Sequence, residues 1–416
     1  MSGLATGTSP ADKALARTGW TVLAVCFVLN MFGRGLGDMY TVFLLPIERE
    51  LGWNRSQLTS VYSVYLLVNG CIAPFVGFAF DRLGARWVYA LGLGAIGSAY
   101  LLASGLTSLW HFFLFIGAMI GVGVSFTGMV PASGLLSRWF RVKLSRVLGI
   151  AFAAGGLGVV IFVPLAQWLI DHHGWRFAYR AYGIAILGLI PLVLFAIPWK
   201  RFASGHPRVR KAEKEAGARD GWTLAKAART RLYWGCVQAF FFTAAGMFSV
   251  IVQVVVMLID AGFTPITAAT AFGFVGMLST VSVMGSGFLA ERYGALRTAT
   301  ISYAGTIAGM ALLAALTVWP SMLLLVLFVP VFGLCMGVRG PIISAICTRS
   351  FAGPQAATIY GTVYSCNALG AALGSLVGGV LHDLTGGYVA GFAVSITCIC
   401  IACAAFWTVP QMRSFK

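Results

Sequence analysis

Charged residues are scarce in this sequence. Only 10% of the 416 residues are Asp, Glu, Lys or Arg, whereas soluble globular domains carry about 25%. Acidic residues are the rarest of these, with 12 Asp and Glu against 29 Lys and Arg, and hydrophobic residues reach 59%. This composition excludes an ordinary water-soluble protein and is typical of a chain that crosses a membrane many times.

Residues that commonly carry catalysis or bind metals are also few. The five histidines fall at or near the ends of apolar segments or in loops, and the nine cysteines lie inside apolar segments with no histidine beside them. The sequence contains no phosphate-binding loop, nucleophile elbow or metal-ligand cluster. We therefore predict no enzyme activity, no cofactor and no metal site, and interpret the cysteines as packing residues.

The sequence does contain a series of apolar segments, each long enough to cross a hydrocarbon core about 30 Å thick as a helix. We predict an all-α membrane protein with twelve transmembrane helices. This even number places both termini on one side of the membrane. The predicted spans are residues 19–45, 57–80, 87–106, 109–137, 147–170, 177–198, 232–259, 266–290, 298–318, 321–347, 358–381 and 388–409.

The distribution of basic residues sets the orientation. With both termini in the cytoplasm, 23 Lys and Arg fall in inside loops and tails and four in outside loops. Such an excess on the cytoplasmic side is the rule for multi-pass proteins. We therefore predict a cell-membrane protein, an inner-membrane one in a bacterium, with cytoplasmic termini. The basic loops and tails account for the net charge of +17, so this charge does not indicate a nucleic acid as a partner.

The two halves of the chain repeat each other. Gly77-Phe-Ala-Phe-Asp-Arg-Leu-Gly-Ala85 after the second span recurs as Gly287-Phe-Leu-Ala-Glu-Arg-Tyr-Gly-Ala295 after the eighth, 210 residues later, and Pro131 and Pro341 have the same offset. Two pseudo-symmetric six-helix bundles explain this repeat. The predicted organisation is a cytoplasmic tail 1–18, a bundle 19–198, a basic cytoplasmic linker 199–231 that includes a short surface helix, a bundle 232–409 and a cytoplasmic tail 410–416.

The repeated loop pattern, Gly-x-x-x-(Asp/Glu)-Arg-x-Gly-Ala, strongly resembles that of the major facilitator superfamily. The resemblance covers residues 19–410 and implies two bundles that rock about a central site in alternating access. The acid at each helix end can pair with a basic group of a neighbouring helix and hold one conformation. The resemblance thus assigns gating roles to Asp81, Arg82, Glu291 and Arg292.

A second run of residues narrows the family. Thr41-Val-Phe-Leu-Leu-Pro-Ile47, followed by Leu51-Gly-Trp-Asn-Arg-Ser56, looks like the region of spans 1 and 2 in the monocarboxylate transporter and oxalate/formate exchanger group. The resemblance implies small carboxylates as the substrate class. We expect transport to be driven by protons or by exchange for a counter-anion.

Three charges lie at membrane depth: Arg34 and Asp38 on the first span and Arg339 on the tenth. A charge there costs at least about 2.5–3.5 kcal/mol and marks a functional site by default. Their net charge of +1 favours an anion, and a guanidinium matches a carboxylate in a two-pronged contact. Arg34 and Asp38 share one helix face, so they either neutralise each other or serve substrate binding and proton coupling. Arg339 has no acid within a turn of its helix, which indicates substrate contact or gating, although its flanking glycines also suit simple helix packing.

Two polar stripes occur at helical spacing and would face the interior of the bundles. Each member could donate a hydrogen bond to a small anion, or could simply join two helices. The stripes consist of Tyr62, Tyr65 and Asn69 on the second span, and Tyr360, Tyr364 and Asn367 on the eleventh.

The leading hypothesis from the sequence is a monomeric secondary active transporter of a small organic anion, above all a monocarboxylate. We assign substrate binding to Arg339, Arg34, Tyr62, Tyr65, Asn69, Tyr364 and Asn367, and proton coupling to Asp38. Efflux of amphipathic drugs is an alternative that Asp38 and Phe240-Phe241-Phe242 support. A membrane sensor or scaffold that binds ligand without moving it is another, but a doubled gating motif is useful only if two conformations exchange.

Overall fold

The computed structural model describes residues 10–53, 55–141, 143–207, 209 and 221–415. Residues 1–9 of the predicted N-terminal tail and residues 210–220 of the predicted linker lie outside this set. All regular secondary structure in the described part of the chain is helical.

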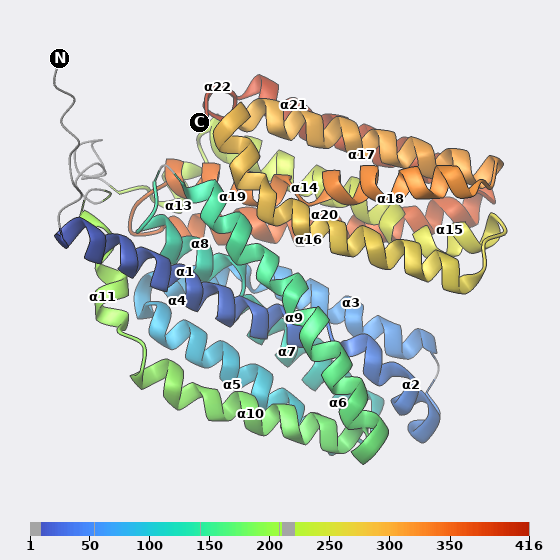
Figure 1. The fold of residues 1–416 in the computed structure, drawn as a ribbon, viewed down its shortest axis with the longest axis horizontal. Coiled ribbons are helices and arrows are strands. Elements are labelled where there is room, and N and C mark those ends of the chain that lie inside the picture. The colour runs from blue at the N-terminus through green and yellow to red at the C-terminus, as the bar shows by residue number, and fades with distance from the viewer. Residues whose placement is uncertain (1–9, 54, 142, 208, 210–220, 416) are drawn as a thin grey trace.

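The helices form two groups, which Figure 1 shows as separate bundles. The N-terminal bundle contains α1 (Pro10–Gly37), α2 (Tyr40–Leu51), α3 (Arg55–Cys71), α4 (Ala73–Leu83), α5 (Ala85–Ala103), α6 (Leu109–Phe112), a π-helical segment (Phe113–Met119), α7 (Ile120–Thr127), α8 (Met129–Ser137), α9 (Leu144–His173) and α10 (Trp175–Phe195). The C-terminal bundle contains α14 (Arg231–Ile251), α15 (Val254–Asp260), α16 (Pro265–Tyr293), α17 (Ala295–Val318), α18 (Met322–Met336), α19 (Arg339–Ser350), α20 (Ala356–Thr385) and α21 (Val389–Thr408). Three short helices lie outside the bundles: α11 (Trp199–Ser204), α13 (Leu224–Ala227) and α22 (Pro410–Arg413).

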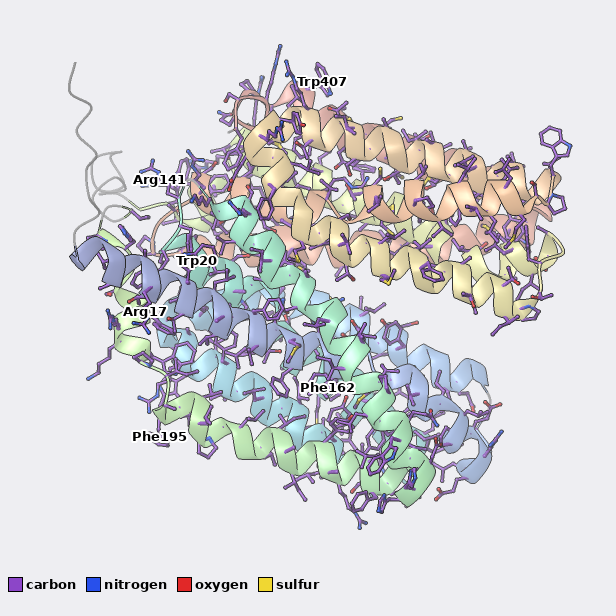
Figure 2. All side chains as sticks on the ribbon, in the orientation of Figure 1. Arg17, Trp20, Arg141, Phe162, Phe195 and Trp407 are labelled. Carbon is purple, nitrogen blue, oxygen red and sulfur yellow. The ribbon has the colours of Figure 1, made fainter. Side chains whose placement is uncertain are left out.

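The described helices are long and apolar enough for a multi-pass membrane protein. Ten helical stretches are long and apolar enough to cross a membrane. The number becomes eleven if α3 and α4, which are bent by 44° against each other, are counted together as one span. The remaining predicted span, residues 87–106, corresponds to the 19-residue helix α5. Apolar side chains cover the flanks of the bundles: Phe195 and Trp407, 78% and 52% exposed, point away from the protein in Figure 2.

Five of the predicted continuous spans are interrupted. α3 and α4 are separated at Ile72. α1 and α2 are separated at Asp38 and Met39, α7 and α8 at Gly128, α14 and α15 at Val252 and Gln253, and α18 and α19 at Gly337 and Val338. Two of the breaks have a proline as the physical reason. Pro131 and Pro341 are each the third residue of the following helix, and a proline has no N–H for the preceding turn.

The two bundles meet at one end and diverge toward the other. In Figure 1 the start of α1, the helices α11 and α13, and α22 gather at one end, which we call the linker end. The other end, where α2 and α15 lie, we call the far end.

Glycines allow the close contact at the linker end. A Cβ on Gly77 of α4 would lie 2.3 Å from the carbonyl oxygen of Ala357, in the first turn of α20. A Cβ on Gly287 of α16 would lie 2.0 Å from the Cα of Arg146, in the first turn of α9. The repeated loop motif therefore brings the two bundles into backbone contact twice, at pseudo-symmetric positions.

Candidate functional site

The break in the first span places Asp38 beside the helix that carries Arg34. The Asp38 backbone N–H donates to the carbonyl of Arg34 at 2.9 Å, so the chain makes one more helical bond before it turns into α2. The residue before Asp38 must be small, because a Cβ on Gly37 would lie 2.8 Å from the hydroxyl of Tyr65. This close approach lets a tyrosine of α3 reach Asp38.

Arg34 and Asp38 form an ion pair. Nη2 of Arg34 lies 3.4 Å from Oδ2 of Asp38, and the two side chains are 28% and 21% exposed. The other carboxylate oxygen accepts a hydrogen bond from the Tyr65 hydroxyl at 3.0 Å and a longer one from Tyr62 at 3.5 Å. Three donors thus surround one carboxylate, and the positive and negative charges offset each other.

Close packing of α1 on α9 positions the arginine. A Cβ on Gly155 of α9 would lie 2.9 Å from the Cβ of Arg34, and one on Gly35 would lie 2.6 Å from the backbone of Gly158. These glycines let the two helices touch. The stem of Arg34 therefore lies against the backbone of α9.

Arg34 lines a narrow cavity between the two bundles. This cavity is small, with a volume of about 10 Å³, and is lined by Arg34, Asn69, Val124, Ser125, Gly128, Met129, Val130 and Tyr364. Tyr364 comes from α20 in the C-terminal bundle, and the other seven residues come from the N-terminal bundle. A ligand held here would contact both bundles at once.

The structure brings together some of the predicted binding residues and separates others. Arg34, Asn69 and Tyr364 share the cavity, while Tyr62 and Tyr65 bind Asp38. Asn367 turns toward its own bundle, where its side-chain amide donates to the carbonyl of Phe240 at 3.3 Å.

Sequence reasoning missed the wall formed by the break between α7 and α8. Ser125, Gly128 and Met129 line the cavity there, and the Ser125 hydroxyl is buried without a hydrogen-bond partner among the described residues. The available signal was the proline repeat, since Pro131 marks the start of α8 as Pro341 marks the start of α19.

Arg339 lies away from this cavity in the observed conformation. Its side chain is 1% exposed, and its guanidinium carbon lies 4.6 Å from the ring centroid of Tyr303 on α17. Nη2 donates to the carbonyl of Met336 at 3.1 Å and to the sulfur of Met247 at 3.6 Å. Nε and Nη1 are buried and have no partner within the described part of the chain. The charge therefore points into the core of the C-terminal bundle.

The acid of the first loop motif holds the two bundles together at the linker end. Oδ2 of Asp81 accepts hydrogen bonds from the backbone N–H and the hydroxyl of Thr358, at 2.9 and 2.7 Å. Thr358 lies in the first turn of α20, where free N–H groups favour a negative charge. The sequence predicted a basic partner. Arg138 supplies a favourable charge interaction, but the direct partner is the helix N-terminus.

The second loop motif is not engaged in the same way. Glu291 is exposed and has no hydrogen bond or ion pair that involves another described residue. The arginines of both motifs lie over aromatic rings of their own helices, Arg82 at 4.3 Å from the ring centroid of Phe78 and Arg292 at 5.5 Å from that of Tyr293. Within the described residues, the acid of the first motif, Asp81, therefore makes a polar contact between the bundles, and the acid of the second motif, Glu291, does not.

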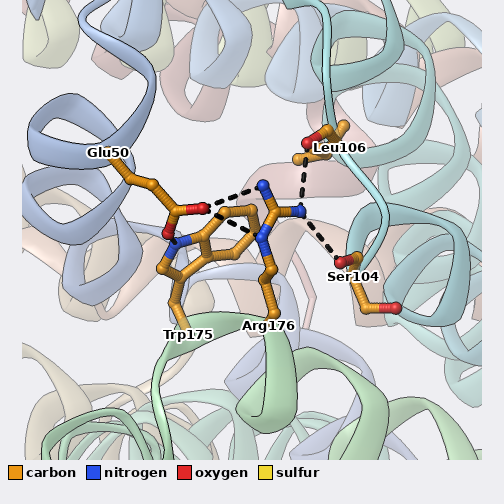
Figure 3. Close-up of polar contacts among 5 residues, drawn as sticks. All are labelled: Glu50, Ser104, Leu106, Trp175 and Arg176. Carbon is orange, nitrogen blue, oxygen red and sulfur yellow. Dashed lines mark hydrogen bonds and ion pairs between the residues drawn. The ribbon is translucent and has the colours of Figure 1, made fainter.

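A further polar cluster fixes the far end of the N-terminal bundle (Figure 3). Glu50 in the last turn of α2 pairs with Arg176 of α10, with Nε and Nη2 each 3.0 Å from Oε1. Nη1 of the same arginine donates to the carbonyls of Ser104 and Leu106, both at 3.1 Å. Trp175 donates its indole N–H to Glu50. This cluster anchors α2, the half-helix that follows Asp38.

Two related helical bundles around a cavity with membrane-depth charges define a membrane transporter. The family model of the Major Facilitator Superfamily matches residues 23–375 and again residues 280–415, and the chain belongs to this superfamily. The predicted fold of twelve transmembrane helices is thereby confirmed. The chain is a multi-pass membrane transporter and not an enzyme.

Individual relatives cover nearly the whole chain. Monocarboxylate transporter 13 of Bos taurus is 25% identical over 400 residues, which are 96% of this chain and 91% of that protein. An uncharacterized MFS-type transporter of Bacillus subtilis, YcxA, is 25% identical over 388 residues, 91% of this chain and 92% of that one. Among solved structures, the proton:xylose symporter XylE aligns with a TM-score of 0.74 at 12% identity, over 95% of this chain and 96% of that chain. The likeness to XylE shows the shared fold alone.

Proposed function

We propose that this transporter carries a small organic anion, in particular a monocarboxylate, by alternating access. The observation that carries the proposal is the Arg34 guanidinium, which lines the cavity between the bundles and is held by a carboxylate of its own helix. The similarity to monocarboxylate transporters over most of the chain supports the same substrate class.

The geometry suggests how a carboxylate would be recognised. A substrate carboxylate can take the place of Asp38 on the Arg34 guanidinium in a two-pronged contact. It would then displace Asp38 or require that Asp38 be protonated, because two carboxylates beside one arginine repel each other. At this step, substrate binding would become coupled either to the protonation of Asp38 or to the earlier release of a counter-anion.

The same cavity suggests how binding is linked to movement. An anion on Arg34 also lies next to Tyr364, a hydroxyl donor from the other bundle. A ligand shifts the equilibrium between two conformations only if it binds one of them more tightly. Contact with both bundles in only one conformation would provide this difference in affinity. Because the bundles meet at the linker end, the observed conformation faces the far end. With the basic loops in the cytoplasm, it is the outward-facing state.

Uptake of labelled carboxylates into proteoliposomes tests the proposal. We expect the purified full-length protein to take up a small monocarboxylate faster than protein-free vesicles, and Arg34→Gln to abolish this uptake. Arg297→Gln, which neutralises an exposed arginine of α17, is the matched control and should transport normally. If no carboxylate is taken up, with or without a pH gradient or an internal counter-anion, the substrate class is wrong.

A further inference from the structure

Arg339 is the strongest electrostatic anomaly in the described structure. A buried charge is normally paired with an opposite charge, because desolvation otherwise costs several kcal/mol. No acid forms an ion pair with Arg339 among the described residues, and two of its nitrogens have no partner. The start of a helix is also an unfavourable place for a cation, and Arg339 is the first residue of α19.

The pseudo-symmetry of the two bundles shows which way this position faces. α8 begins at Met129 and α19 begins at Arg339, 210 residues later, and each has its proline as the third residue. Met129 and the next residue, Val130, line the cavity beside Arg34. The halves of this fold are related by an axis along the membrane normal, so the matching positions 339 and 340 also face the centre.

The space beside Arg339 agrees with this symmetry. A Cβ added to Gly340, the counterpart of Val130, would meet no atom within 4 Å. The break at Gly337 and Val338 directly precedes Arg339. Its side chain thus starts from a central position next to open space, but extends the opposite way, to Tyr303 and Met247.

We propose that Arg339 turns from the pocket beside Tyr303 into the central cavity when a carboxylate is bound, and becomes its second guanidinium ligand. This inference rests on the proposed function and deepens it, because the anion would be held by Arg34 from one bundle and Arg339 from the other. The break before α19 is the hinge. The unpaired nitrogens of Arg339 find their acceptors only in the substrate-bound state.

Replacement of Arg339 by methionine separates this role from a structural one. The pocket around the guanidinium is formed by Tyr303, Met247 and Met336, so a methionine of similar length fits it without an unpaired charge. We expect Arg339→Met to unfold at a temperature equal to or above that of the wild type in the absence of ligand. We also expect it to bind carboxylate about tenfold to a hundredfold more weakly, the loss for a charged hydrogen-bonded contact.

The experiment measures thermal unfolding of the purified full-length protein by tryptophan fluorescence, with acetate, lactate, pyruvate and oxalate as probes. Arg297→Met, the same change at an exposed arginine of α17, is the matched control and should bind as the wild type does. Wild-type affinity in Arg339→Met overturns the inference, whether or not the ligand-free stability of the variant changes. If Arg339→Met does not fold, Arg339→Lys decides: it keeps the charge but loses the two-pronged contact, so wild-type affinity in it also overturns the inference. Absence of carboxylate binding by the wild type itself would overturn the proposed function and this assignment together.

Discussion

Arg34 and Asp38 illustrate how a charge is kept at membrane depth. An isolated charge there costs at least about 2.5–3.5 kcal/mol, and the 3.4 Å ion pair reduces this cost for both residues. The hydroxyl of Tyr65 adds a hydrogen bond to Asp38. A substrate carboxylate on Arg34 would keep the guanidinium paired, so the site would stay electrically balanced when the substrate replaces Asp38.

The first prediction concerns Asp38→Asn, which mimics the protonated carboxyl. We expect exchange of labelled carboxylate across the membrane to continue, because Arg34 is then free to bind substrate. Accumulation driven by a pH gradient should be lost, because the residue can no longer take up a proton. Both are measured in proteoliposomes, with and without an imposed gradient.

Asp171→Asn is the control for this prediction. Asp171 is an exposed carboxylate at the far end of α9, where it binds Gln167. Its replacement should leave both activities unchanged. If Asp38→Asn still concentrates substrate as the wild type does, Asp38 is not the proton carrier, and exchange or uniport becomes the better description.

At the scale of helices, the apolar periods and loops of the sequence were enough to place the spans and to recognise the repeated halves. The breaks inside the helices were not predicted. The residues around Asp38 and Gly337 include glycines and charges, but glycines also occur inside unbroken helices such as α9 and α20. The breaks depend on tertiary packing, such as the contact of α1 with Gly155 and Gly158. Arg34 and Tyr364, which the sequence predicted as binding residues, line the cavity between the bundles. The sequence did not predict that Arg339 turns away from this cavity toward Tyr303, because the direction of its side chain also depends on tertiary packing.

The second prediction concerns the anchor of α2. Arg176→Leu removes an ion pair with Glu50 and leaves the carbonyls of Ser104 and Leu106 without this donor. Each buried group left unsatisfied costs about 1–3 kcal/mol, so we expect a clear decrease in the unfolding temperature. Arg49→Leu, which changes an exposed arginine of the same α2 turn, should have little effect. Equal unfolding temperatures for the two variants would show that the cluster contributes nothing.

At the scale of the whole molecule, the observed conformation depends on direct contact between α4 and α20. The third prediction tests this contact at Gly361, where a Cβ would lie 2.4 Å from the carbonyl oxygen of Ala73. Gly361→Ala should push the helices apart and lower the yield of a disulfide cross-link engineered between the linker ends of α4 and α20. Gly379→Ala, in the same helix but with no atom within 4 Å, should leave the yield unchanged. A normal cross-link in Gly361→Ala would mean that the helices absorb the methyl group without separating.

The last prediction concerns the polar latch at the linker end, which is made by one of the two loop motifs. Asp81 receives two hydrogen bonds from the first turn of α20, whereas Glu291 has none within the described residues. Asp81→Asn keeps an acceptor oxygen but loses the charge. Since charge-assisted bonds are about twice as strong as neutral ones, we expect a loss of about 1 kcal/mol, which is roughly a fivefold shift toward the open linker end.

Glu291→Gln is the matched comparison, because it removes the charge of the repeat-related residue without breaking a bond seen in this state. Distances between spin labels at the linker ends of α4 and α20 measure the populations directly. Asp81→Asn should add a longer distance, and Glu291→Gln should keep the wild-type distribution. If the two variants shift the distribution equally, the two motifs share the latch and the observed asymmetry has no energetic consequence. If neither shifts it, backbone contact at Gly77 and Gly287 is sufficient to keep the linker end closed.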